Sequence, residues 1–190
     1  MSLCRFIREK HRELTQQHSY PLHNLLGPII SALFTGNAIV VKNSENTAWS
    51  SIYYANIARS ALIACGHDPD LVHAITCWPQ TADHLTSHPG ISHMTFIGSK
   101  PVAHAVAKSA AKVLMPLCVE LGGKDAAMIL DDPSGKATSQ GEMNRVASII
   151  MRGVFQSAGQ NCIGIERVVA MPQAYERLIN MLEPRIKALR

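Results

Sequence analysis

LHNLLGPIISALFTGNAIVVK, residues 22–42, contains the pattern that recurs along the chain. Its first part, Leu22–Phe34, spaces apolar residues as one face of a helix does, and Thr35-Gly36-Asn37 supplies a stop. Its second part, Ala38–Lys42, is a continuous run of strand length, rich in β-branched residues. We therefore expect a helix, a tight turn and a buried strand in that order.

The alternation of helix and strand continues toward the C-terminus. The expected helices are 47–65, 101–114, 143–157 and 173 to the end, and the expected strands are 71–77, 92–97, 117–121, 126–130 and 167–171. Such alternation predicts an α/β fold with a parallel sheet and helices on both faces. Strands of that kind are buried on both sides, which explains continuous apolar runs. Residues 131–142 form a polar, breaker-rich loop between the two halves of the pattern.

The composition allows a sizeable core. Hydrophobic residues make up 47% of the chain but aromatic residues only 5%, so Ala, Val, Ile, Leu and Met must fill that core. The formal charge of +4 is dispersed, and its one concentration, residues 5–13, is interrupted by Glu9 and Glu13. A dispersed surplus favours solubility over phosphate binding, so we expect no nucleic-acid partner.

The cysteines indicate a reducing compartment. They are five in number, which is odd, and they show no CxxC spacing. We therefore expect no disulfide framework and an intracellular, cytoplasmic location. No apolar run reaches about 18 residues, and the N-terminal segment has no apolar stretch behind its charges, so neither a transmembrane helix nor a signal peptide is predicted in this chain.

Two residues are candidates for covalent and acid–base chemistry. Cys162 lies in a turn between Gly159 and Gly164, where backbone N–H groups could serve a nucleophile, although a buried structural cysteine is the commoner outcome for such a pattern. Glu120 ends the apolar run PLCVE and precedes two glycines. It fits either a general base with a raised pKa or a surface glutamate leading into a turn.

Four further residues are candidates for cofactor binding. Lys42 and Glu45 follow an expected strand and could hold ribose hydroxyls, or form a solvated strand end before a helix. Gly98 and Ser99 open an expected helix whose free N–H groups could meet a pyrophosphate, although GxGxxG is absent. His84 and His88 have the spacing of metal ligands but no third partner, so no metal site is predicted.

The order of these motifs resembles the aldehyde dehydrogenase superfamily. TGNAIVVKNSE, FIGS, VELGGKD and FQSAGQNC followed by ERVV occur in that order between Tyr20 and Arg190. The wording of residues 20–42 is most similar to a fungal branch of aldehyde dehydrogenase-like proteins. The resemblance implies an incomplete Rossmann-type parallel sheet plus the first part of a catalytic domain. The implied boundaries are 1–19 for a non-family segment, 20–121 for a partial NAD(P)-binding domain and 122–190 for the catalytic part.

The resemblance also implies roles for the candidate residues. Cys162 would attack an aldehyde and pass through a thiohemiacetal and a thioester, and Glu120 would activate water. Lys42 and Glu45 would hold the adenosine ribose, while Gly98 and Ser99 would meet the pyrophosphate. NAD is the implied cofactor, since Glu45 would repel a 2′-phosphate, and NADP stays open.

Some positions depart from the family pattern. Gln17-His18-Ser19 stands where the family has Pro-Trp-Asn, whose amide helps to bind the oxyanion. Losing one such donor typically costs about 10²–10³ in rate. Ala103 replaces a glycine that many members have. An abrupt end inside the last helix, and family regions missing at both ends, predict a fragment of a longer enzyme, while Ser19 and the missing ends favour an inactive relative.

Several alternatives remain open at this stage. A catalytically inactive or truncated relative would act by association with an intact subunit, and a homo-oligomer is a further option. An acylating or semialdehyde-specific enzyme would use the same cysteine but release a different product. A membrane association would require a segment outside this chain.

Overall fold

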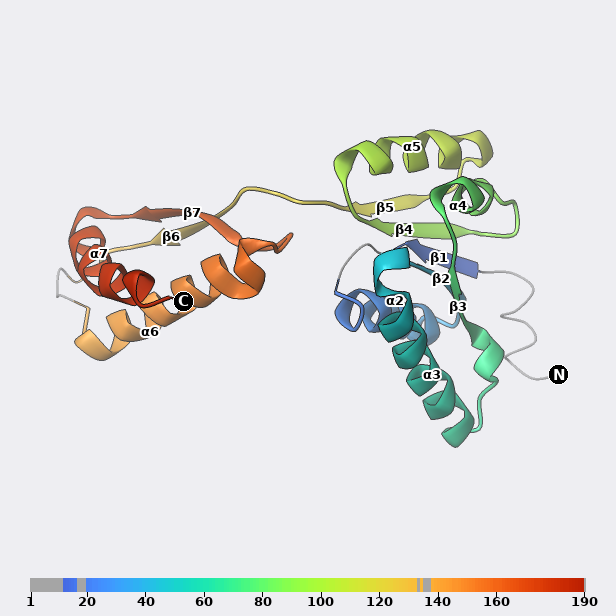
Figure 1. Ribbon diagram of the computed structural model, residues 1–190, viewed down its shortest axis with the longest axis horizontal. Coiled ribbons are helices and arrows are strands. Elements are labelled where there is room, and N and C mark those ends of the chain that lie inside the picture. The colour runs from blue at the N-terminus through green and yellow to red at the C-terminus, as the bar shows by residue number, and fades with distance from the viewer. Residues whose placement is uncertain (1–11, 17–19, 133, 135–137, 190) are drawn as a thin grey trace. The chain divides into compact units, whose positions relative to one another are not determined.

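The computed structural model describes residues 12–16, 20–132, 134 and 138–189 (Figure 1). The chain divides into two compact units, residues 1–121 and residues 122–190. Within the described residues, no helix has the length and apolar character needed to cross a bilayer.

The first unit contains a five-stranded parallel sheet. Its strands are β1 (Arg12–Gln16), β2 (Ala38–Asn43), β3 (Val72–Thr76), β4 (His93–Ile97) and β5 (Leu117–Glu120), in the spatial order β3-β2-β1-β4-β5. The chain winds outward from β1 to β3 and then returns to add β4 and β5 on the other side. The direction of winding therefore reverses between β1 and β4, which is where ligands bind in open parallel sheets.

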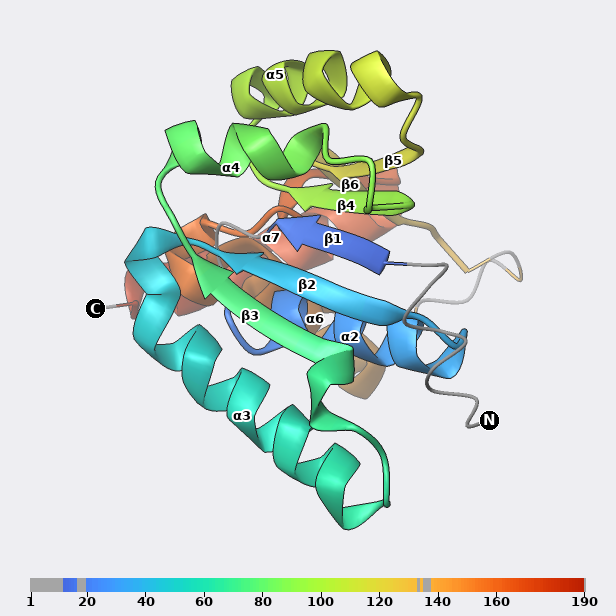
Figure 2. The same ribbon diagram turned by 90° about the vertical axis from the view of Figure 1, so that its right-hand side faces the viewer.

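Helices cover both faces of this sheet. Helices α2 (His23–Phe34) and α3 (Ala48–Ala64) lie on one face, and α4 (Pro79–Thr86) and α5 (Lys100–Ala110) lie on the other (Figure 2). Short 3-10 turns connect them: η1 (Glu45–Thr47), η2 (Pro69–Leu71) and η3 (Ala111–Val113). Pro101, near the start of α5, suits a first turn in which no N–H is needed.

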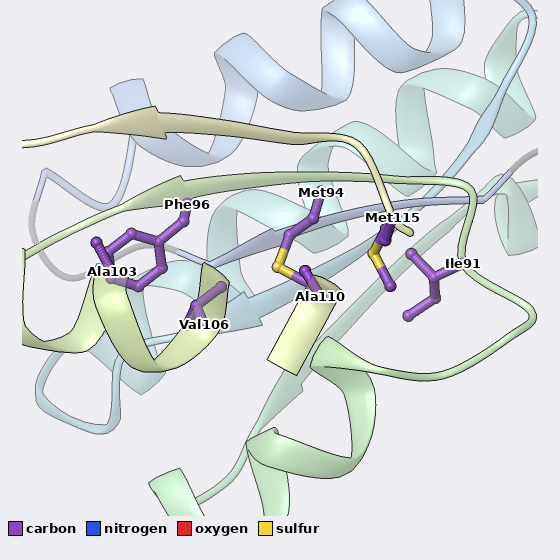
Figure 3. Close-up of a cluster of buried hydrophobic side chains, with 7 residues drawn as sticks. All are labelled: Ile91, Met94, Phe96, Ala103, Val106, Ala110 and Met115. Atoms are coloured by element: carbon purple, nitrogen blue, oxygen red, sulfur yellow. The ribbon is translucent and has the colours of Figure 1, made fainter. Parts of the chain in front are cut away.

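Each face of the sheet has its own apolar core. Beneath α2 and α3 the cluster includes Leu25, Ile29, Ile39, Val41 and Val72. Beneath α5 the cluster consists of Ile91, Met94, Phe96, Ala103, Val106, Ala110 and Met115. Figure 3 shows the Phe96 ring beside Ala103 and the Met94 side chain beside Ala110. Small residues on α5 thus let the helix lie close to the large side chains of β4.

The second unit is a two-stranded parallel sheet with two helices. Its elements are β6 (Asp125–Ile129), α6 (Gln140–Phe155), η4 (Gln156–Gly159), β7 (Ile165–Ala170) and α7 (Pro172–Lys187). Met143 and Ala147 of α6 pack against Leu178 of α7. The carboxylate of Asp131 accepts a hydrogen bond of 2.9 Å from the N–H of Ala174, so a residue beyond β6 caps α7.

The α/β class and the parallel sheet are confirmed, and the expected elements are present with bounds shifted by a few residues. The sequence analysis missed two elements. Strand β1 reads RELTQ, in which Leu14 is the sole strongly apolar residue, yet it occupies the centre of the sheet. Helix α4 is only eight residues long, too short for a periodic signal.

The expectation that all strands are buried on both faces is wrong for this chain. Most residues of β5, β6 and β7 are exposed, and Met128 of β6 is 70% exposed. The reason is their position: among the described strands β5 is at an edge, and β6 and β7 pair with each other and with no third strand.

Candidate active site and cofactor-binding edge

The carboxyl ends of the strands in the first unit meet at one edge of the sheet. Gln16, the last residue of β1, is in register with Lys42 of β2 on one side and with Phe96 of β4 on the other. Neighbouring strands lie about 4.8 Å apart, so the ends of β2 and β4, on either side of β1, are roughly 10 Å from each other. Lys42 is near the end of β2, and Gly98 directly follows β4. The fold thus brings Lys42, Glu45, Gly98 and Ser99 to a common edge.

Lys42 is buried at this edge, with 4% of the residue exposed. Its ammonium lies 3.5 Å from Oε2 of Glu45, whose side chain is 31% exposed. Among the described residues, Glu45 is the single acceptor of a hydrogen bond from this ammonium, which has three N–H donors. The solvated strand end considered from sequence does not describe Lys42. Ser44 completes the turn by accepting a hydrogen bond from the N–H of Asn46.

Gly98 and Ser99 join β4 to α5. The N–H of Gly98 donates to the carbonyl of Glu120 at 3.1 Å, so it belongs to the sheet and is not one of the free donors expected there. The open donors belong instead to the first turn of α5, which Ser99 begins without a side-chain cap. A Cβ at Gly98 would lie 2.7 Å from Cζ of Phe96, which explains the glycine.

Glu120 ends β5 with its side chain exposed. Its backbone carbonyl is fixed by Gly98, while no described residue makes a hydrogen bond or ion pair with its carboxylate. The carboxylate is therefore available to solvent and to a ligand.

Cys162 lies in the second unit, in the turn between η4 and β7. The N–H of Gly164 donates to the carbonyl of Asn161 at 3.0 Å and closes the turn around Cys162 and Ile163. The Cys162 side chain is half-buried, and its Sγ lies 3.9 Å from Oδ1 of Asn161. The turn thus presents the thiol at the surface and leaves it partly shielded.

The segment before this turn has an unusual backbone. Ser157, Ala158 and Gly159 have φ values of 55°, 56° and 75°, in the left-handed region. Residues other than glycine are strained in that region of backbone conformation. A Cβ at Gly159 would lie 3.3 Å from the carbonyl oxygen of Val154. The chain therefore makes a left-handed reversal just ahead of Cys162.

Polar contacts join the segment Gly122-Gly123-Lys124 to β7, the strand that follows Cys162. Lys124 forms an ion pair with Glu166, and Arg167 donates from Nε and Nη2 to the carbonyl of Lys124 at 3.0 and 2.6 Å. Asp125 is in register with Ile165. The residues that precede β6 and β7 therefore lie at the same end of the two-stranded sheet. The sequence analysis missed this clamp because residues more than forty positions apart carry no local signal.

The structure brings together only some of the predicted residues. Lys42, Glu45, Gly98, Ser99 and Glu120 belong to the first unit, and Cys162 belongs to the second. Gln17-His18-Ser19 lies outside the described residues. The rings of His84 and His88 contact each other at 5.5 Å, and among the described residues no three His, Cys, Asp or Glu side chains gather as metal ligands.

Three other cysteines lie among the described residues. Cys65 and Cys118 are exposed, and Cys77 is half-buried. All three are free thiols, as is Cys162. Burial thus does not single out Cys162, and its distinction lies in the turn that carries it.

The order of the strands and the reversal at β1 define an open, doubly wound α/β sheet, a fold in which ligands bind beyond the carboxyl ends of the strands. The family model described as "Aldehyde dehydrogenase family" matches residues 18–190. The chain belongs to the aldehyde dehydrogenase family.

Two fungal relatives are similar over 90% of this chain. An aldehyde dehydrogenase-like protein of Schizosaccharomyces pombe is 59% identical over 172 residues, and one of Saccharomyces cerevisiae is 54% identical over 175 residues. The matched region is 31% of the first relative and 26% of the second, so the chain spans about a third of their length or less. The resemblance to a fungal branch is confirmed.

Solved structures agree on the fold. An aldehyde dehydrogenase from Burkholderia cenocepacia matches with a TM-score of 0.77 at 26% identity, over 94% of this chain and 35% of that one. A 3,6-anhydro-L-galactose dehydrogenase in complex with NAP matches with a TM-score of 0.77 at 20% identity, over 97% of this chain and 36% of that one.

Proposed function

We propose that this chain carries the thiol and part of the dinucleotide site of an NAD(P)-dependent aldehyde dehydrogenase. The observation that carries the proposal is the buried Lys42 ammonium with Glu45, at the carboxyl edge where the winding of the sheet reverses. The glycine-flanked turn that presents Cys162 supports the same proposal from the second unit. In domain terms, residues 20–121 act as a partial NAD(P)-binding domain and residues 122–190 as the first part of a catalytic domain.

Cys162 acts as the nucleophile. Its sulfur adds to the aldehyde carbon, the carbonyl oxygen takes the negative charge, and a thiohemiacetal forms. The thiol proton passes to water as the C–S bond forms. The half-buried position suits this step, since the sulfur is reachable by a small substrate while the turn around it limits contact with water.

Glu120 acts as the general base in the second half of the reaction. Once the acyl group is held on Cys162 as a thioester, the carboxylate takes a proton from water, water attacks the acyl carbon, and the C–S bond breaks to release the acid. An exposed carboxylate with no competing ion pair is suited to accept that proton.

The residues present fit a dinucleotide. Lys42 has N–H donors beyond the one shared with Glu45, which suits the hydroxyls of the adenosine ribose. The first turn of α5 offers N–H groups to a pyrophosphate. When bound, the cofactor supplies the acceptor for the hydride that leaves the thiohemiacetal carbon.

NAD is the favoured cofactor. Glu45 places a carboxylate beside Lys42, and a second negative charge from a 2′-phosphate would be repelled by it. The substitution Glu45→Gln should therefore raise the affinity for NADP relative to that for NAD. Calorimetric titration of both nucleotides measures this ratio, and an unchanged ratio argues against the preference.

Cofactor binding by the chain itself tests the proposal. NAD should bind at up to millimolar concentration, and Lys42→Met should weaken binding roughly tenfold or more, because a charge-assisted hydrogen bond is lost. Lys108→Met, which removes an exposed lysine from the last turn of α5, measures the general effect of removing a positive charge. Absence of binding at millimolar NAD would overturn the proposal for this chain.

Turnover tests the thiol. A panel of aldehydes with NAD should give NADH, with Cys162→Ser inactive and Cys118→Ser, at another free thiol, active. Intact NAD binding without turnover would favour the inactive alternative, which acts by association with an intact subunit. A coenzyme A thioester in place of the free acid would identify the acylating type.

A further inference from the structure

We infer that Asn161 is a positioning residue for the Cys162 thiol, an inference that rests on the proposed function of that thiol. The Asn161 carboxamide oxygen lies close to the thiol. Oδ1 lies 3.9 Å from Sγ of Cys162, within reach of an S–H donor, and 3.5 Å from the N–H of Ile163. One oxygen thus faces both the thiol and the backbone on the far side of it.

The backbone of Asn161 is fixed at the same time. Its carbonyl accepts the N–H of Gly164 at 3.0 Å, and Gly164 is buried. A Cβ at Gly164 would lie 3.1 Å from that carbonyl oxygen, so the turn closes tightly because the residue is glycine. Asn161 therefore holds the turn through its main chain and the thiol through its side chain.

Asparagine is well suited to this double role. Its side-chain carbonyl commonly accepts the N–H two residues later and mimics a backbone turn. A residue without an acceptor at this distance, such as alanine, would keep the backbone bond to Gly164 and lose both side-chain contacts. The Cys162 side chain would then be free to occupy other staggered rotamers.

The consequence concerns the direction in which the sulfur faces. With Asn161 in place, one Cys162 rotamer is favoured, and the S–H is directed at Oδ1. Without it, the sulfur samples several directions and its S–H is no longer engaged. Asn161 touches neither aldehyde nor cofactor in this account, and it acts only through Cys162.

The test uses the unmodified chain first. The Hα–Hβ couplings of Cys162, measured by NMR on labelled protein, should show one dominant rotamer. Averaged couplings would overturn the inference without any variant. In Asn161→Ala the couplings should average, and alkylation of Cys162 by iodoacetamide should become roughly two- to tenfold faster, the range expected for one neutral hydrogen bond.

Rescue and control variants separate positioning from general loosening. Asn161→Asp keeps the acceptor oxygen and should restore the single rotamer, so averaged couplings in that variant contradict the inference. Ile163→Ala changes an exposed neighbour in the same turn and should leave the rotamer and the alkylation rate unaltered. Alkylation of the exposed Cys118, followed in the same samples by mass spectrometry, measures any overall unfolding.

These measurements use neither aldehyde nor cofactor. A failure of positioning would therefore leave NAD binding and turnover to be judged by themselves. Conversely, a chain that turns over no aldehyde would still show whether Asn161 fixes the thiol.

Discussion

Each of the two units of this chain is stabilised internally by a different kind of interaction. The first has a sheet of five strands with an apolar cluster on each face, and Leu25, Val41 and Met94 are fully buried. The second has a pair of parallel strands and a smaller core, and exposed polar contacts such as the Lys124–Glu166 pair join the start of one strand to the other. A two-stranded sheet buries too little to be stable by itself, so contacts of this kind gain weight.

The contrast bears on the chemistry. In the first unit the residues proposed to bind the cofactor follow the ends of strands that the apolar clusters hold in place, so packing fixes the positions of these residues. In the second unit the thiol is carried by a turn whose shape depends on hydrogen bonds and on a left-handed segment. The first unit therefore tolerates surface change near its site better than the second does.

The largest effect is expected from a cavity in the first unit. Phe96→Ala removes a ring that is 2% exposed and should lower the free energy of unfolding by about 3–5 kcal/mol. Urea denaturation followed by circular dichroism measures the loss, and hydrogen exchange should locate it in β4 and α5. Val102→Ala, at a partly exposed position of α5, serves as the control. Equal losses in the two variants would break the contrast.

A smaller effect is expected from the clamp in the second unit. Arg167→Ala removes both hydrogen bonds to the Lys124 carbonyl and should cost about 1–2 kcal/mol, since the contact is exposed. Faster hydrogen exchange should appear in β6 and β7. Arg145→Ala removes an exposed arginine of α6 and should change little. If the two arginine variants behave alike, polar contacts do not hold this unit.

Relief of backbone strain should stabilise the second unit. Ala158 has a φ of 56°, which glycine adopts without a steric cost, so Ala158→Gly should raise the free energy of unfolding by about 0.5–1 kcal/mol. The matched change Ala61→Gly, inside α3, should lower it by about 1 kcal/mol. Denaturation curves of the two variants should therefore shift in opposite directions.

The smallest effect is a pH dependence of α6. A hydrogen bond from the Ser139 side chain, together with one from its backbone N–H, lowers the pKa of Glu142 from its ordinary 4.5. Because the folded pKa is the lower one, the capping box contributes fully above pH 4.5, and its contribution is lost as the pH falls through the lowered pKa. After correction for the intrinsic pH dependence of exchange, the protection of the amides in the first turn of α6 should fall in that range, and Glu142→Gln should abolish this dependence.

The sequence predicted most of the first unit because its signals are local. The run Ala38–Lys42 and the stop at Thr35-Gly36-Asn37 specify a strand and a turn without reference to the rest of the chain. Strand β1 escaped prediction because its place in the centre depends on pairing with β2 and β4 and not on its own composition. Motif order located Lys42, Gly98 and Cys162, whose roles remain predictions.

The site details that escaped prediction are those made by distant partners. The burial of Lys42 depends on how the sheet packs, and the use of the Gly98 N–H depends on the carbonyl of Glu120. The contact of Asn161 with the thiol depends on side-chain direction inside a turn. No spacing rule contains this information, because it arises only when the chain has folded.

The burial of Lys42 has a consequence for chemical damage to the protein. Aldehydes condense with free lysine amines to form Schiff bases, so under the proposed function this chain would be exposed to damage by its substrates. The amines of Lys124 and Lys187 are largely exposed, with 73% of each side chain open to solvent. The amine of Lys42, with 5% of its side chain exposed and Glu45 beside it, is sheltered from such adducts. An aged sample should therefore carry its modifications on the surface lysines, while the lysine proposed to hold the cofactor stays intact.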